Sequence, residues 1–258
     1  MHILIVNPNT STSLTERMER AARCQIPADV TLSSRTAPRG FPYISNRAEA
    51  QVAGSVTLEM LARQGTGTDA AIVAAFGDPG ARAARDLRPF PVIGVAEAAM
   101  HSAAMLGERF GILAFSRQMQ GWYRDCVHQV GLERRFAGFR APAVAPRSPD
   151  TAQEDLHDAL LDCLRDCQDR DGADVVIVAG APLAGFATLA AGETRLPLVD
   201  PVIAALHQAV ALSRLAARRG RHERDDPKPS TGLDPELAAL FLAGSPHPRA
   251  NGRAGGNP

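Results

Sequence analysis

The sequence predicts an α/β fold of two pseudo-symmetric lobes, each a parallel sheet flanked by helices, with an active-site cleft between them. Two observations support this prediction. Short apolar segments alternate with segments of helical periodicity, and the pattern of the first half returns in the second half. Alternation with short connections favours parallel sheets, because two parallel neighbours need a crossover that a helix supplies.

The first half of the chain contains four predicted strands, each followed by a predicted helix. Each strand is a short apolar run bounded by turn residues, which is typical of a strand buried on both faces. The strands are His2–Val6, Val30–Ser33, Asp69–Ala75 and Pro91–Val95, and the helices are a segment with Leu14, Met18, Ala21 and Ala22 on one face, Glu49–Arg63, Ala81–Leu87 and Glu97–Leu106.

An internal duplication indicates that there are two lobes. Four segments of the first half recur in the same order, at an offset that stays at about 105 residues. One match between apolar strands is weak evidence for a duplication, whereas four matches in the same order at one offset indicate a repeated unit. The matched pairs are Asp69–Phe76 with Asp174–Ala181, Pro91–Ile93 with Pro197–Val199, Ala98–His101 with Ala204–His207, and His2–Val6 with Phe110–Phe115.

The duplication divides the chain into domains. Residues 1–98 with about 201–218 form the predicted first lobe, because the last helix returns to it, and residues 99–200 form the second lobe. Residues 219–258 are rich in charged residues, Pro and Gly, and are predicted to be mostly disordered. A short helix is expected near residues 234–243, with an apolar face that would dock on the body or on a neighbouring subunit.

Composition narrows the class of partner and the compartment. The formal net charge is +0 and 22% of residues are charged, so no electrostatic feature favours nucleic acid or an anionic membrane. No apolar run is long enough to span a bilayer, and the N-terminus lacks a signal-peptide pattern, so a cytoplasmic location is expected. The four cysteines lack the spacing of a metal site. A homo-oligomer is possible.

The loops after the predicted strands are where a ligand is expected, since parallel sheets bind ligands beyond the carboxyl ends of their strands. These loops contain Asn7–Ser11, Phe76–Gly80, Ser116–Gln118 and Gly180–Gly185. Asn7, Asn9 and Thr10 stand before a helix N-terminus and suit a carboxylate, carbonyl or phosphate oxygen. Helix capping is the alternative role for the same residues.

Three motifs together resemble hydantoin racemases. They are NPNTS at 7–11, FGDPG at 76–80 and PVIGVAEAAMH at 91–101, and the resemblance covers about residues 2–215. It extends to the superfamily that includes aspartate, glutamate and allantoin racemases, maleate isomerase and arylmalonate decarboxylase. The resemblance implies two pseudo-symmetric α/β lobes, no cofactor, and a small carboxylate or cyclic amide held between the lobes. No metal site is expected.

The resemblance also implies where catalytic cysteines would stand. Racemases of this family place one cysteine at each lobe's side of the cleft, one to remove a proton and one to return it. The matching positions here are Ala75 and Gly180, which have no ionisable group. Because each acid or base contributes roughly 10²–10⁴-fold, two-thiol racemisation is not expected.

Other candidate residues come from the loops around the expected cleft. Asp78 could be a carboxyl base, or it could brace its turn. The resemblance implies that Tyr43 and Arg47 belong to a covering loop, and that Ser116 and Arg117 hold substrate oxygens; a solvated Arg117 is the alternative. The backbone groups of Gly77, Gly180 and Ala181 are the remaining candidates.

The expected activity is therefore that of a cofactor-independent enzyme acting at a carbon adjacent to a carbonyl. Isomerisation, decarboxylation, elimination and cyclisation can all pass through an enolate-like intermediate, which needs preorganised donors more than two thiols. Two alternatives remain: a catalytically inactive ligand-binding homologue, and a hydantoin or amino-acid racemase that uses bases other than cysteine.

Overall fold

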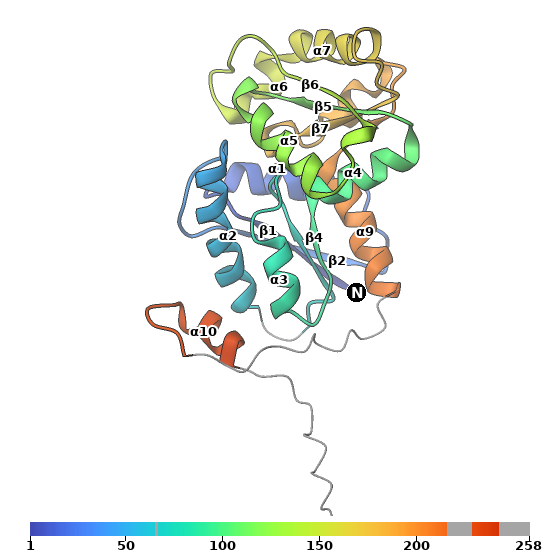
Figure 1. Cartoon of the computed structure of the whole chain (residues 1–258). Helices are drawn as coiled ribbons and strands as arrows, with labels where there is room; N and C mark the ends of the chain where they lie inside the picture. Colours follow the sequence, from blue (N-terminus) through green and yellow to red (C-terminus); the bar gives the residue numbers. More distant parts are fainter. Residues whose placement is uncertain (65–66, 216–228, 243–258) are drawn as a thin grey trace, which may run out of the picture.

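The computed structural model describes residues 1–64, 67–215 and 229–242. It contains two four-stranded parallel sheets flanked by helices (Figure 1), so the predicted α/β class with two similar sheets is confirmed. The strand orders are β2-β1-β3-β4 and β6-β5-β7-β8. The strands are β1 His2–Asn7, β2 Thr31–Thr36, β3 Ala70–Val73, β4 Val92–Gly94, β5 Phe110–Ala114, β6 Phe136–Arg140, β7 Val175–Ala179 and β8 Leu198–Val199.

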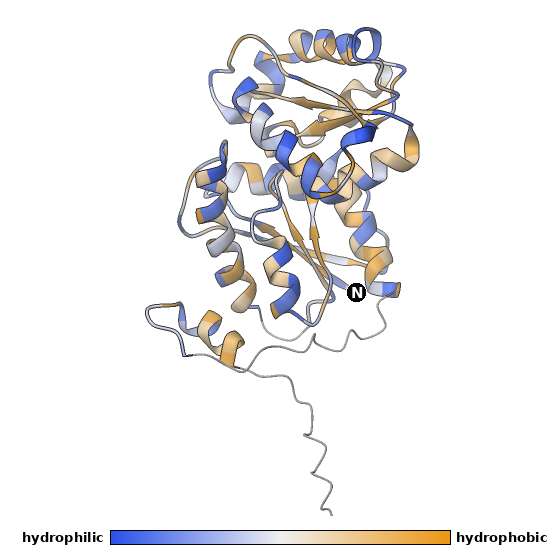
Figure 2. Cartoon of the chain, in the orientation of Figure 1, coloured by the Kyte–Doolittle hydropathy of each residue, from blue (hydrophilic) through white to orange (hydrophobic). Residues whose placement is uncertain are grey.

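Helices cover both sheets and leave the apolar strands inside, as the hydropathy colouring shows (Figure 2). In α1, Leu14, Met18 and Ala22 form the buried face, and Ser11 caps the first turn by accepting from the Leu14 N–H at 3.2 Å. The helices are α1 Thr12–Arg23, α2 Arg47–Ala62, α3 Ala81–Leu87, α4 Val95–Leu106, α5 Gln120–Gln129, α6 Ala152–Asp155, α7 His157–Asp169, α8 Phe186–Leu189, α9 Pro201–Leu215 and α10 Pro235–Leu242.

The two sheets have the same topology, which is the structural counterpart of the duplicated sequence. In each sheet the third strand along the chain, β3 or β7, lies inside, and the second, β2 or β6, lies at an edge. The sequence did not predict β6. Each of its five residues is half-buried, because an edge strand is covered on fewer sides, so its residues need not form an apolar run.

The chain passes between the lobes twice, from α4 into β5 and from β8 into α9. These two helices pack against each other, with the Gln208 side-chain amide donating to the Ala98 carbonyl at 2.9 Å and to the Ser102 hydroxyl at 3.1 Å. Helix α9 also contacts β3, β4 and α1 of the first lobe. The domain limits proposed from the sequence remain a prediction, although this return of α9 fits them.

The carboxyl ends of the two sheets face each other, and aromatic side chains join them. Gly77 of the first lobe lies against the ring of Trp122 of the second. The rings of Phe76 and Tyr123, also from opposite lobes, have centroids 4.5 Å apart, within the range of favourable aromatic pairs.

The expected short C-terminal helix is α10, which docks on the chain's own body beside α2 (Figure 1). Asp234 accepts from the Leu237 N–H at 3.2 Å and pairs with Arg63 of the loop after α2, and Leu237 is buried. The rest of the predicted tail, residues 219–228 and 243–258, and the predicted helix end at 216–218 lie outside the described residues.

We expect Gly77→Ala to lower the free energy of unfolding by about 2–4 kcal/mol. Gly77 has φ +113°, and an added Cβ would overlap the Trp122 ring. Gly185→Ala is the matched control, because Gly185 has φ +88° with nothing near its missing Cβ, so it should cost only about 1 kcal/mol. Urea denaturation measures both, and equal losses would show that contact between the lobes does not add to the strain.

Candidate functional site

A small cavity lies between the lobes at the carboxyl ends of the strands. Its volume is about 20 Å³, room for about one water molecule. Larger hollows lie elsewhere on the described surface. One of about 420 Å³, at the carboxyl end of β6, includes Arg117 and Arg140 in its lining, and one of about 250 Å³ lies among α3, α4 and α9. The cavity is lined from the first lobe by Asn9, Leu14, Tyr43, Ile44, Ala75 and Phe76, and from the second lobe by Phe115, Met119, Tyr123, Gly180, Ala181 and Pro182.

Ala75 and Gly180 line this one cavity from opposite lobes. Ala75 follows β3, and Gly180 follows β7 with φ +103°. A Cβ at Gly180 would stand 3.4 Å from the Phe115 ring and 3.7 Å from the Tyr123 hydroxyl oxygen. The two positions at which the resemblance implies thiols therefore share one space.

The four cysteines all lie in the described part of the chain, and none of them lines this cavity. Cys24 is exposed, Cys163 is half-buried, and Cys126 and Cys167 are buried. Burial raises the pKa of Cys126 to about 12, and its thiol donates to the Trp122 carbonyl at 3.3 Å.

Two buried polar side chains line the cavity with donor groups that no described residue binds. The Asn9 Oδ1 accepts from the Asn7 amide and the Ser11 N–H, both at 3.0 Å, and its NH₂ group has no hydrogen-bond partner in the described structure. The Tyr123 hydroxyl likewise makes no bond to a described residue, although only 2% of the residue is exposed. Burial raises the pKa of Tyr123, so the hydroxyl is a neutral donor.

Sequence reasoning identified Asn9 and missed Tyr123. Tyr123 lies on α5, and its only visible signal is an aromatic residue on a helix face, which core packing explains equally well. It reaches the cavity because α5 packs over the carboxyl end of β5, and no motif marks that contact.

The other polar residues predicted in the first loop have structural partners instead. Asn7 is fully buried, and its amide donates to Asn9, to the Ser11 carbonyl and to the Thr15 hydroxyl. The Thr10 N–H donates to the Phe41 carbonyl at 2.8 Å. These bonds hold the loop so that Asn9 faces the cavity.

Asp78 is placed outside the cavity lining, and its contacts are those of a brace. Its two carboxylate oxygens accept from the N–H groups of Ala96 and Glu97, each at 2.8 Å, at the N-terminus of α4. Asp200 has the matching place in the second lobe, since it accepts from Gly185 at 2.6 Å and from Val202 at 2.9 Å. Each lobe thus ties its cavity loop to the N-terminus of a crossing helix.

Several further candidates are also turned away from the cavity. The Arg47 guanidinium pairs with Asp125 and donates to the Gly121 carbonyl at 3.1 Å. Ser116 accepts from the Gln118 N–H at 3.4 Å, and Arg117 donates to the Ala141 carbonyl at 3.5 Å. Of the predicted site residues, the structure gathers Asn9, Tyr43, Ala75, Gly180 and Ala181 at the cavity and leaves out Asn7, Thr10, Arg47, Gly77, Asp78, Ser116 and Arg117.

The lining is electrically neutral. Among the described residues that form it there is no Asp, Glu, Lys, Arg or His. The described chain also holds no cluster of three or more His, Cys, Asp or Glu that could bind a metal ion. The arrangement can donate hydrogen bonds to an acceptor oxygen and surround the rest of a small molecule with apolar atoms.

The Asp78 carboxyl should make stability depend on pH. Burial raises its pKa to about 7, against the opposing effect of its two backbone N–H bonds. Because the pKa in the fold exceeds the unfolded value of about 4, folding favours the protonated form. This contribution is full below about pH 4 and is lost as pH rises through about 7.

We therefore expect the Tm of the wild type to fall more between pH 5 and 8 than the Tm of Asp78→Asn, measured by differential scanning calorimetry. Parallel Tm profiles for the two proteins would contradict the raised pKa.

Known proteins are similar to this chain in sequence and in fold. The profile of the Asp/Glu/Hydantoin racemase family matches residues 3–209. A hydantoin racemase of Paenarthrobacter aurescens is 30% identical over 217 residues, 83% of this chain and 92% of that protein. Allantoin racemase from Klebsiella pneumoniae has a TM-score of 0.83 at 30% identity, covering 92% of this chain and 98% of its own.

The allantoin racemase of Pseudomonas fluorescens gives a TM-score of 0.81 at 26% identity, covering 90% of this chain and 100% of its own. Both lobes are included in these matches, since they extend over nearly all of the residues in the two sheets. The chain belongs to the Asp/Glu/Hydantoin racemase family.

Proposed function

We propose that this chain is a cofactor-independent enzyme that acts on a small molecule at a carbon next to a carbonyl, without a pair of thiols. The observation that carries the proposal is the pairing of Ala75 and Gly180 across one cavity that also presents two free donors, Asn9 and Tyr123. The racemase relatives support a small-molecule substrate, and the lining of the cavity supports chemistry without thiols.

The two donors suit a carbonyl oxygen that gains negative charge. When a bond at the neighbouring carbon breaks, its electron pair moves onto this oxygen, and the Asn9 amide and Tyr123 hydroxyl stabilise the enolate. Neither donor carries a charge, and no cation lines the described cavity. The neutral lining offers donors to the carbonyl oxygens of a cyclic amide, but no arginine that would stabilise a carboxylate in its charged state.

Decarboxylation is the reaction of this group that the lining favours. It forms the enolate without removing a proton: the carbon–carbon bond to a carboxylate breaks, carbon dioxide leaves, and water returns a proton to the carbon. Isomerisation, elimination and cyclisation need a base at the reacting carbon, and no described lining residue supplies a carboxylate, imidazole or thiol. An apolar wall beside the departing carboxylate also disfavours its charged state.

A second candidate is a ligand-binding protein that performs no chemistry. The absence of an ionisable group from the described lining favours it. Incubation with hydantoins that carry a carboxylate on the ring carbon separates the two functions, because the enzyme releases carbon dioxide and the binder returns its ligand unaltered.

Hydrogen exchange tests the absence of racemisation. In D₂O, we expect the ring-carbon hydrogen of L-5-methylhydantoin to exchange for deuterium no faster with the wild type than in solvent alone. NMR measures this exchange rate. A double variant, Ala75→Cys with Gly180→Cys, should gain exchange, because it puts thiols on both faces of the cavity. Exchange by the wild type above the solvent rate would support a racemase with other bases and overturn the proposal.

Tyr123→Phe should separate binding from stability. The hydroxyl has no partner in the described structure, so its removal should leave the Tm unchanged or slightly higher. Loss of one neutral hydrogen bond to the ligand should weaken binding of 5-methylhydantoin by about 3–10-fold, measured by isothermal titration calorimetry. Unchanged affinity would exclude the Tyr123 hydroxyl from the binding site. Tyr43→Phe removes a hydroxyl from the more exposed wall of the same cavity and serves for comparison.

A further inference from the structure

The cavity is too small for the ligands that the proposed function requires. A volume of about 20 Å³ holds about one water molecule, whereas a hydantoin ring with its two carbonyl oxygens contains seven non-hydrogen atoms. Six lining residues come from each lobe, so the cavity enlarges when the lobes separate. Admission of a ligand therefore requires a movement of one lobe relative to the other.

The covalent connections restrict where such a movement can be centred. Both crossings between the lobes run through α4 and α9, which pack against each other. Figure 1 shows these helices together at the right of the molecule, with α2 on the left. The α4–α9 pair is thus the natural hinge, and the lobes would part on the side of α2.

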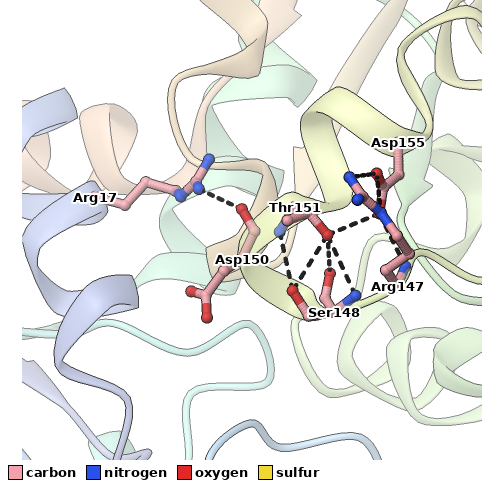
Figure 3. Close-up of polar contacts among 6 residues, drawn as sticks. All are labelled: Arg17, Arg147, Ser148, Asp150, Thr151 and Asp155. Atoms are coloured by element: carbon pink, nitrogen blue, oxygen red, sulfur yellow. Dashed lines mark hydrogen bonds and ion pairs between the residues drawn. The ribbon is translucent and has the colours of Figure 1, made fainter.

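A first polar clasp joins α1 of the first lobe to the segment before α6 of the second. The Ser13 hydroxyl donates to the Asp150 carboxylate at 2.6 Å, and the Arg17 guanidinium donates to the Asp150 backbone carbonyl at 2.7 Å. Figure 3 shows Arg17 reaching across to this carbonyl. These residues are separated by more than 130 positions in the sequence, so the contact exists only while the lobes are together.

The segment around Asp150 is held by several hydrogen bonds, two of which connect it to the cavity wall. Ser148 and Thr151 form a capping box, and Asp155 accepts from Thr151 and Arg147 (Figure 3). The Gln153 amide then donates to the carbonyls of Pro182 at 3.0 Å and of Ala184 at 2.9 Å. Movement at Asp150 is therefore transmitted to the loop that contains Gly180.

A second clasp joins the N-terminus of α2 to α5. The Arg47 guanidinium pairs with the Asp125 carboxylate and donates to the Gly121 carbonyl. Gly121 precedes Trp122, whose ring contacts Gly77 of the first lobe, and Tyr123, which lines the cavity. Both clasps thus connect a helix of the first lobe to a cavity-lining segment of the second.

We propose that these two clasps, Asp150 with Ser13 and Arg17, and Arg47 with Asp125 and Gly121, form a gate that opens to admit the ligand and closes over it. Both are formed by exposed side chains at the surface. Such exposed polar pairs are individually weak, so they part readily, whereas the packed α4–α9 hinge persists. The gate rests on the proposed function only in that the cavity is taken as the ligand site.

The test uses Trp122, the only tryptophan of the chain, which is 7% exposed and lies against Gly77 of the other lobe. Acrylamide quenching of its fluorescence reports separation of the lobes in the full-length protein without any ligand. For Arg17→Met combined with Arg47→Met, we expect the quenching constant to rise at least about two-fold, because the open form becomes more populated.

Arg39→Met is the matched control. Arg39 is a similarly exposed arginine of the first lobe that pairs with Glu59 of the same lobe, so its loss should leave quenching unchanged. Circular dichroism melting checks that each variant is folded. Unchanged quenching in a folded double variant overturns the gate, and so does an equal rise in Arg39→Met, which would indicate an effect of charge alone.

A second measurement follows association of 5-methylhydantoin by stopped-flow Trp122 fluorescence. The double variant should bind at least about two-fold faster than the wild type. Increased quenching without faster association would show that the clasps hold the lobes but do not limit access, and would overturn the gate. The quenching result needs no ligand, so a failure of the proposed function cannot be mistaken for a failure of the gate.

Discussion

Two carboxylates, Asp78 and Asp200, hold the cavity loops of the two lobes to the N-termini of the crossing helices. Asp78 sends its side chain from the loop after β3 to the N–H groups that open α4. Asp200 stands at the start of α9 and accepts from the loop after β7 through Gly185. In the first lobe the carboxylate belongs to the loop and binds the helix, whereas in the second lobe it belongs to the helix start and binds the loop. Ala75 and Gly180 lie in these two loops and line the cavity from opposite lobes, so the two links hold the segments that contain both positions.

The site's chemistry follows from which polar groups remain without a partner once the fold is satisfied. Most polar atoms near the cavity are engaged in holding loops, as the amide of Asn7 is. The Asn9 amide and the Tyr123 hydroxyl are the side-chain donors of the described lining left for a ligand. Both donors face the cavity, and the proposed function assigns them to an acceptor oxygen of a bound molecule.

Family membership accounts for the architecture of this chain, whereas the side chains at the cavity bear on its chemistry. The match to hydantoin and allantoin racemases extends through both sheets, and it accounts for the lobes and the cavity between them. The reacting groups depend on a few side chains at that cavity, which sequence identity near 30% does not preserve in general. The polar clasps between the lobes also depend on a few side chains, such as the pair Arg47 and Asp125.

The sequence by itself determined the architecture: apolar runs alternating with helical segments predicted parallel sheets, and the repeat near 105 residues predicted two similar lobes. It also marked Asn9, because strand ends in parallel sheets converge on one edge, and the resemblance to hydantoin racemases marked Ala75 and Gly180. Only the tertiary structure decided that Tyr123 reaches the cavity, that Asp78 binds α4, and that Arg47 turns to Asp125. These outcomes depend on contacts between residues 18 to 78 positions apart. Local periodicity describes which face of an element is buried, but not which partner covers it.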